Sequence, residues 1–247
     1  MDDLARQRAA TLRFWRDDVS VRPGGEWAEI DTVQVHTTGL APRHWNGAFL
    51  TAPTDLGPIL PQIAAWFAAR DKPWGLLVPA ELDVAPPGLT HAADQKVMLR
   101  RLDTVPDAPL PVGIDTTDRA PLADVALVQS EAFGDPYDVT RAFVAPTLGP
   151  SAAPPQLTVT AYDAGEPVGC ATVARMDRVA GIYGVAVREA WRRRGIGAAL
   201  TALCLREARA SACDLAYLNP SEIGYAVYAS LGFVDAAPMR IWVPPGG

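Results

Sequence analysis

Three consecutive arginines stand directly before two glycines in the segment WRRRGIGAAL, residues 191–200. The arginines supply positive charge and forked N–H donors, which suit phosphate. Gly195 and Gly197 lack a Cβ atom, so ligand oxygens can approach their backbone closely. An amphipathic helix is predicted to begin here, and the free N–H groups at a helix start attract anions. The segment therefore predicts a pyrophosphate-binding loop between a strand ending at Val187 and a helix.

Two common phosphate-binding motifs do not fit this loop. A P-loop needs Gly-Lys-Ser/Thr after its glycines, and Ala198 and Ala199 stand there instead. A dinucleotide fingerprint needs a third glycine, where this chain has Leu200, and an acidic residue about 20 positions on, where the next predicted strand ends in Asn219. The chain that remains is too short for a doubly wound sheet. A loop for an acyl-coenzyme A is the remaining class.

The elements that must position this loop follow from hydrophobic periodicity. Around it, strands are predicted at residues 111–117, 156–162, 168–176, 180–187, 215–219 and 239–243, and helices at 121–133, 195–211 and 224–233. In the first half, strands are predicted within 27–38, 45–51, 74–79 and 96–102, and a helix at 59–70. This order predicts an α/β chain of the α+β kind, with a mixed sheet.

Composition excludes several classes of protein. The chain has 247 residues and a formal net charge of −6, which suits one large or two small globular domains and argues against a nucleic-acid-binding surface. No apolar run is long enough to cross a bilayer and the charged start shows no secretory signal, so we expect a cytoplasmic protein without a membrane partner. The three cysteines and three histidines have no ligand spacing, which predicts no metal site.

The sequence also indicates two halves. A proline-rich stretch at 105–121 predicts a boundary between domains 1–107 and 108–247. Shifting the first half by 141 residues superimposes identical residues in the same order of strand, short helix and strand, which indicates a diverged internal repeat. The coinciding residues of the first half are Leu77, Pro79, Glu81, Ala85, Asp94 and Met98. Its equivalent of the arginine–glycine loop reads TAPTDL, without arginine or glycine.

Two segments carry a resemblance to a known family. VAVREAWRRRGIGAAL resembles motif A of the GNAT superfamily of N-acetyltransferases, in which a V-x-V strand end precedes R/Q-x-x-G-x-G/A and a long helix. NPSEIGYAVYASLGF, at 219–233, is similar to the later family block that ends in Y-x-x-L-G-F. The resemblance covers about residues 110–247. It implies a GNAT fold with splayed central strands flanked by helices, plus a truncated GNAT-like first half whose own site is degenerate.

The resemblance also implies a reaction and its residues. An amine would attack the thioester of acetyl-CoA directly in a ternary complex, and Tyr228 would protonate the leaving thiolate. The implied cofactor-binding residues are Val185, Ala186, Val187, Arg192, Arg193, Arg194, Gly195, Ile196, Gly197, Ala198 and Ser221. The partners implied are acyl-CoA and an unidentified amine, without a metal, and a homodimer is left open.

One expected group is missing. Many relatives carry a glutamate on the strand before the loop as general base, and GIYGVAV has none. Glu131, Asp135 or a chain of water molecules remain as candidates. The missing glutamate favours an alternative, a non-catalytic acyl-CoA-binding or regulatory module, whereas the intact Tyr228 favours the enzyme. A third hypothesis is a structural pairing module that binds no CoA.

Overall fold

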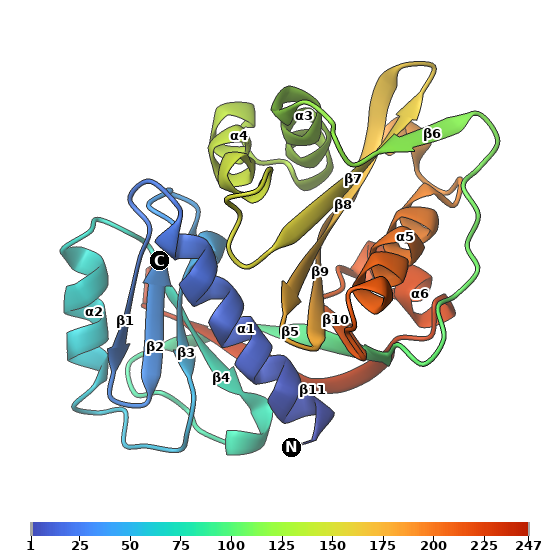
Figure 1. Cartoon of the computed structure of the whole chain (residues 1–247). Coiled ribbons are helices and arrows are strands. Elements are labelled where there is room, and N and C mark those ends of the chain that lie inside the picture. Colours follow the sequence, from blue (N-terminus) through green and yellow to red (C-terminus); the bar gives the residue numbers. More distant parts are fainter. Residues whose placement is uncertain (1, 247) are drawn as a thin grey trace. The chain divides into compact units, whose positions relative to one another are not determined.

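The computed structural model describes residues 2–246, which form two compact units (Figure 1). The first unit contains the chain up to Phe14 together with Met98–Val234. The second contains Trp15–Val97 together with the chain from Asp235 onward. Each unit therefore takes most of its residues from one half of the sequence and an end segment from the other. The predicted division of the sequence into two domains stays a prediction.

The sheet of the first unit is antiparallel except for one parallel pair. Its strands lie in the order β6 (Ile114–Thr117), β7 (Gln156–Asp163), β8 (Glu166–Met176), β9 (Val179–Val187), β10 (Leu215–Leu218) and the end of β5 (Thr90–Arg101). β9 and β10 run parallel, and the other neighbours are antiparallel. This is the mixed sheet that the sequence predicted.

Helices cover both faces of this sheet (Figure 1). They are α3 (Leu122–Phe133), α4 (Tyr137–Val144), α5 (Ile196–Ala210), α6 (Glu222–Ser230) and the first part of α1 (Asp3–Ser20), with short 3-10 turns η3 (Ala145–Thr147) and η4 (Glu189–Trp191). Cys170 on β8 packs with Val125 of α3, whereas the next residue, Ala171, packs with Ile196 of α5. Successive strand residues point to opposite faces, so α3 and α5 lie on opposite sides of the sheet.

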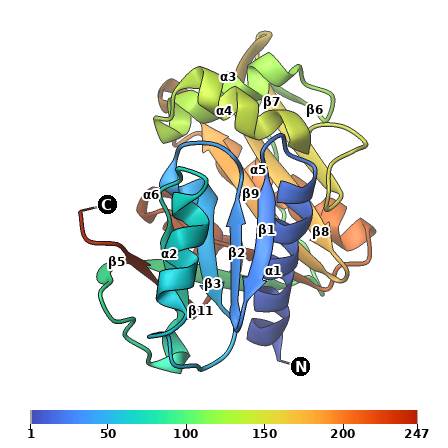
Figure 2. The same cartoon turned by 90° about the vertical axis from the view of Figure 1, so that its left-hand side faces the viewer.

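The second unit is a smaller sheet with α2 (Leu60–Ala68) and the end of α1. Its strands lie in the order β1 (Glu26–Ile30), β2 (Val33–Thr37), β3 (Asn46–Leu50), β4 (Gly75–Pro79) and β11 (Val234–Val243), with 3-10 turns η1 (Arg43–Trp45) and η2 (Ala80–Leu82). Figure 2 shows β1, β2 and β3 side by side with α2 packed against them. Ile63 and Phe67, one turn apart on α2, are fully buried and form the core with Val35 and Leu76.

Each sheet is completed by a strand from the other half of the sequence. β5 follows β4 along the chain, but its end pairs antiparallel with β10, with Met98 opposite Leu218. β11 follows α6 along the chain, but it pairs antiparallel with β4, with Met239 opposite Pro79. The last strands of the two predicted repeats are therefore exchanged between the units.

The predicted helices at 121–133, 195–211 and 224–233 are confirmed as α3, α5 and α6. α6 begins earlier than predicted because the Ser221 side chain caps it, accepting a hydrogen bond from the Gly224 N–H. Two helices, α1 and α4, were not predicted. The buried positions of α1 include Gln7 and Asp18, which dilute the apolar periodicity that would have indicated a helix.

Three further observations bear on the function classes considered above. No helix within residues 2–246 is both long and apolar enough to cross a membrane. Over the same residues, no three histidine, cysteine or carboxylate side chains gather where they could hold a metal ion. Cys170, Cys204 and Cys213 are buried free thiols, and burial raises their pKa values. We assign these cysteines to the core.

Candidate functional site

The turn between β9 and α5 contains two residues in the left-handed region. Arg193 has φ +62° and Gly195 has φ +84°. Gly195 is the N-cap of α5, and no side chain of the described residues caps this helix. A glycine suits this position because other residues are strained at positive φ. The lack of a side-chain cap among the described residues is consistent with an anion-binding helix start, where the first N–H groups are left for a ligand.

Gly197 leaves space at the start of α5. A Cβ atom there would meet only Val187 Cγ2, at 3.7 Å, which is an ordinary contact. The neighbouring Ile196 is 1% exposed and Leu200 is fully buried, so they anchor the helix in the core. Ile196 can therefore contribute only its backbone to a ligand, whereas the Gly197 side of the helix is open to one.

The three arginines have different environments. Arg192 donates from Nε to the Val187 carbonyl at 3.0 Å and from Nη2 to the Ala132 carbonyl at 3.5 Å. Arg194 donates to the Ala190 carbonyl at 3.2 Å. Arg193 is exposed and forms no hydrogen bond or ion pair through its side chain with any residue that the structure describes.

The loop is also tied to the hairpin of β7 and β8 and to the end of α3. Asp163, at the end of β7, accepts a hydrogen bond from Trp191 Nε1 at 2.9 Å. Arg188 donates to Glu131 Oε2 and to Glu166 Oε1, both at 2.6 Å, and the Glu131 hydrogen bond raises the pKa of Arg188. Both oxygens of Glu131 contact this guanidinium, so the structure gives Glu131 a part in holding the loop.

β9 and β10 separate before β9 ends. Their parallel pairing covers three Cα pairs and stops at Gly181 and Tyr217. β9 continues to Val187, so its edge at residues 185–187 has no partner on β10 in the described chain. On the β8 side the register shifts, and Gly184 has φ +56°, the mark of a β-bulge. These are the splayed strands that the sequence resemblance implied.

Tyr228 lies in α6 with its ring 8% exposed. Burial raises its pKa to about 12. The ring packs edge-to-face with Phe233, with centroids 6.1 Å apart. A Cβ atom on Gly224 would lie 2.9 Å from Tyr228 Cε2, so that glycine leaves room for the ring. The site prediction for Ser221 remains untested, but its side chain already serves as the cap of α6.

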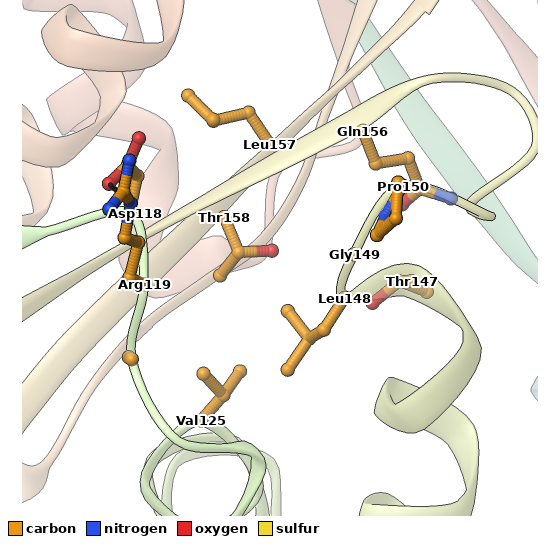
Figure 3. A pocket seen from close by; sticks show the side chains of 11 residues that line it. Asp118, Arg119, Val125, Thr147, Leu148, Gly149, Pro150, Gln156, Leu157 and Thr158 are labelled. Atoms are coloured by element: carbon orange, nitrogen blue, oxygen red, sulfur yellow. Dashed lines mark ion pairs between the residues drawn. The ribbon is translucent and has the colours of Figure 1, made fainter.

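A cavity of about 520 Å³ lies elsewhere in the first unit (Figure 3). It is lined by residues from the start of β7, from the loop after η3 and from α3, among them Thr158, Leu148 and Val125. None of the predicted site residues lines it. The start of β7 lines the cavity, whereas Asp163 at the end of β7 is hydrogen-bonded to Trp191 of the loop. The cavity and the loop therefore lie at opposite ends of β7.

Comparisons with known proteins bear on the family and the fold. Residues 125–233 match the family model for "Acetyltransferase (GNAT) family". No curated protein matches the chain. A GCN5-related N-acetyltransferase from Kribbella flavida has a TM-score of 0.78 at 21% identity, and the match covers 100% of this chain and 97% of that chain.

Two further structures extend the likeness. A GCN5-related N-acetyltransferase from Sphaerobacter thermophilus has a TM-score of 0.63 at 19% identity, over 85% of this chain and 76% of that chain. A tandem GNAT protein from the clavulanic acid biosynthesis pathway has a TM-score of 0.61 at 13% identity, and the match covers 98% of this chain and 94% of that chain. At such identities the likeness concerns the fold. The chain has a GNAT-like fold throughout, and the prediction of a GNAT-like first half is confirmed at that level.

Proposed function

Because residues 125–233 carry a domain of the acetyltransferase (GNAT) family, we propose that this chain transfers the acetyl group of acetyl-CoA to an amine. One observation carries the proposal. The glycine-capped start of α5 stands directly after the unpartnered edge of β9, so an anion-binding helix end and free strand backbone are adjacent. A CoA ester has both matching parts, a pyrophosphate and an amide-bearing pantetheine arm.

In this proposal the backbone does most of the binding. The N–H groups of residues 193–198 hold the pyrophosphate, and Arg193 adds the charge of an uncommitted side chain. The backbone of Val185, Ala186 and Val187 pairs with the pantetheine amides. Ala198, on the first turn of α5, keeps a small side chain beside the phosphates. Arg192 and Arg194 act by holding the loop in shape, since their side chains donate to protein carbonyls.

The chemistry is a direct displacement. The amine nitrogen attacks the thioester carbon, and a backbone N–H near the bulge of β9 stabilises the developing oxyanion. As the C–N bond forms and the C–S bond breaks, Tyr228 donates its proton to the leaving thiolate, and the amine releases one proton to water. The Tyr228 hydroxyl is protonated at neutral pH already at the ordinary tyrosine pKa near 10, and burial raises that pKa to about 12.

Binding and turnover test the proposal separately. Calorimetry with acetyl-CoA should show binding, and CoA without the acetyl group should bind at the same site. A panel of primary amines is then added to the full chain with acetyl-CoA, and released thiol is followed by absorbance. Absence of acetyl-CoA binding would contradict the proposal.

A second candidate, a non-catalytic acyl-CoA-binding or regulatory module, has a specific observation in its favour. β9 carries no carboxylate, and both oxygens of Glu131 contact Arg188. This candidate predicts acetyl-CoA binding without thiol release for every amine, a result that separates it from the enzyme.

A further inference from the structure

Two hydrogen-bonded tyrosines bridge β9 and β10 where the strands separate. The hydroxyls of Tyr183 and Tyr217 are hydrogen-bonded, and their rings lie edge-to-face with centroids 6.0 Å apart. Gly181 and Tyr217 form the last Cα pair of the parallel ladder. The two hydroxyls therefore lie where the gap between β9 and β10 begins, just beyond Gly181 and Tyr217.

The ring of Tyr183 is fixed in an unusual position. It stacks on Phe14 of α1, with centroids 4.3 Å apart and ring planes at 23°. It also lies back over Gly181, where a Cβ atom would be 2.4 Å from Tyr183 Cε2 and 2.7 Å from its hydroxyl oxygen. Only glycine at position 181 leaves room for this arrangement. The sequence Gly-Ile-Tyr thus directs the hydroxyl toward the end of the ladder.

A run of buried and half-buried polar side chains on β10 and α1 continues from the pair. Tyr217 is 1% exposed, and its hydroxyl is also hydrogen-bonded to Thr11. Thr11 Oγ1 in turn accepts a hydrogen bond from Gln7 Nε2 at 2.8 Å. Burying hydroxyl and amide groups costs free energy unless each is hydrogen-bonded, and apolar residues would pack these elements without that cost. The run ends at the half-exposed Tyr183, which is where a ligand could reach it.

The residue after Tyr183 begins the bulge. Gly184 has φ +56°, and a Cβ atom there would lie 2.7 Å from Gln129 Nε2, so glycine lets this side chain of α3 lie against the bulge. The backbone proposed to hold the acyl-CoA follows at Val185. Along β9, Tyr183 therefore stands between the end of the ladder at Gly181 and the edge proposed to hold the acyl-CoA at Val185.

We propose that the Tyr183 hydroxyl binds the acceptor amine and that Tyr217 positions it, an inference that rests on the proposed acetyl transfer. The Tyr183 oxygen accepts a hydrogen bond from one N–H of the neutral amine, which leaves the nitrogen lone pair directed at the thioester carbon. A primary amine has a second N–H, which is the one lost to water when the amide forms. A secondary amine would have to lose the N–H that Tyr183 holds. The site therefore selects primary amines.

The test compares each active primary amine with its N-methyl derivative, using the full chain and thiol release. Tyr183→Phe should lower kcat/KM for the primary amine about tenfold, in keeping with loss of one hydrogen bond, and leave the Kd for acetyl-CoA within twofold. It should also reduce the preference for the primary amine over the N-methyl derivative. Loss of packing alone would not change that preference. Tyr217→Phe should act in the same direction, more weakly.

Two further variants complete the design. Gly181→Ala keeps both hydroxyls but displaces the Tyr183 ring, so it should reproduce the loss. Tyr162→Phe is the matched control, because Tyr162 donates to Asp124 Oδ2 at 2.7 Å on α3 and should leave amine selectivity unchanged.

The outcomes separate the inference from the proposed function. If the protein does not bind acetyl-CoA, both the proposed acetyl transfer and the inference about Tyr183 are contradicted. Acetylation that Tyr183→Phe leaves within twofold, with the amine preference intact, overturns the inference alone. If acetyl-CoA binds but no amine is acetylated, n-propylamine is titrated into CoA-loaded protein carrying tyrosine labelled with ¹³C at Cζ. Selective shifts of the Tyr183 and Tyr217 signals would support the inference, and unchanged signals would overturn it.

Discussion

Arg192 donates from Nε to the carbonyl oxygen of Val187 across 3.0 Å, so the first arginine of the loop is bonded to the strand that precedes it. Its neighbour Arg193 is exposed, and its side chain has no such bond to any residue within 2–246. We therefore expect adjacent residues of the same type to have different roles, Arg192 in keeping the shape of the loop and Arg193 in contacting the proposed ligand.

Arg193→Ala should weaken acetyl-CoA binding about three- to tenfold, because one exposed charge-assisted contact to phosphate is lost. Calorimetry at two salt concentrations measures this. The difference from wild type should shrink at high salt, where exposed charges are screened. Thermal unfolding should be unchanged. An Arg193→Ala protein that binds as tightly as wild type at low salt would exclude the side chain from the site.

Arg192→Ala is the matched comparison. Loss of donors to two carbonyls should lower the free energy of unfolding by about 1–2 kcal/mol, as measured by urea denaturation. Unchanged stability would show that these hydrogen bonds do not hold the loop.

Gly197 gives a prediction in which affinity and stability move in opposite directions. Gly197→Ala fits the protein, since its Cβ meets only Val187 Cγ2 at 3.7 Å, and alanine favours a helix by up to about 1 kcal/mol over glycine. Stability should be kept or raised while acetyl-CoA affinity falls. Gly197→Asp should lower affinity at least tenfold, about 1.4 kcal/mol, because a carboxylate would face the phosphates. If both variants fold and bind acetyl-CoA as tightly as wild type, the phosphate site is not at the start of α5.

The second unit should bind no CoA. Its helix α2 has Ile59 as N-cap and a proline in its first turn, without the left-handed glycine that begins α5. The preceding loop, residues 51–56, contains no arginine. Calorimetry on the full chain should therefore give one CoA per chain, and Gly197→Asp should remove that signal. A stoichiometry of two would reveal a site that these residues do not explain.

Tyr228→Phe separates proton donation from packing. The ring is kept, so the Kd for acetyl-CoA should stay nearly constant, whereas kcat should fall between tenfold and several hundredfold if the hydroxyl protonates the thiolate. Rapid-quench measurements are needed to show that the chemical step limits turnover. If it does and kcat stays within twofold of wild type, Tyr228 is a packing residue.

The raised pKa of Tyr228 predicts how stability and activity depend on alkaline pH. The folded value of about 12 lies above the ordinary value near 10, so burial of the neutral ring stabilises the fold below pH 10. That contribution is lost as pH rises from 10 to 12. We therefore expect no loss of activity from ionisation of Tyr228 up to about pH 10, and alkaline unfolding that is shifted upward in pH for Tyr228→Phe.

Much of the first unit's site region could be predicted because its signals are local. The apolar spacing of α5, the glycines at its start and the Y-x-x-L-G-F end of α6 lie within a few residues of what they determine. Ser221 and Gly224 show the same property, since the cap and the helix it begins are three residues apart. Such features are set by backbone geometry that any sequence must obey.

Other features depend on contacts that no local pattern encodes. Arg192 donates a hydrogen bond to the carbonyl of Ala132, which is 60 positions away in the sequence. The tyrosine pair joins Tyr183 to a residue 34 positions away. α1 was missed because Gln7 and Asp18 occupy buried positions, where the periodicity expects apolar side chains. The only available signal for Tyr183 was its place between two glycines of GIYGVAV.

The exchange of β5 and β11 makes the two halves of the gene product mutually dependent. The first half has neither arginine nor glycine at residues 51–56, so its deletion would remove no proposed cofactor-binding residue. Deletion would, however, remove Met98 and its neighbours, the strand that pairs with β10 beside the proposed acetyl-transfer site. Cutting the chain in the structureless stretch after Leu102 should accordingly yield two fragments that stay together on gel filtration, as interlocked pieces. The first half would in that case be kept for the strand that it supplies to the other unit's sheet.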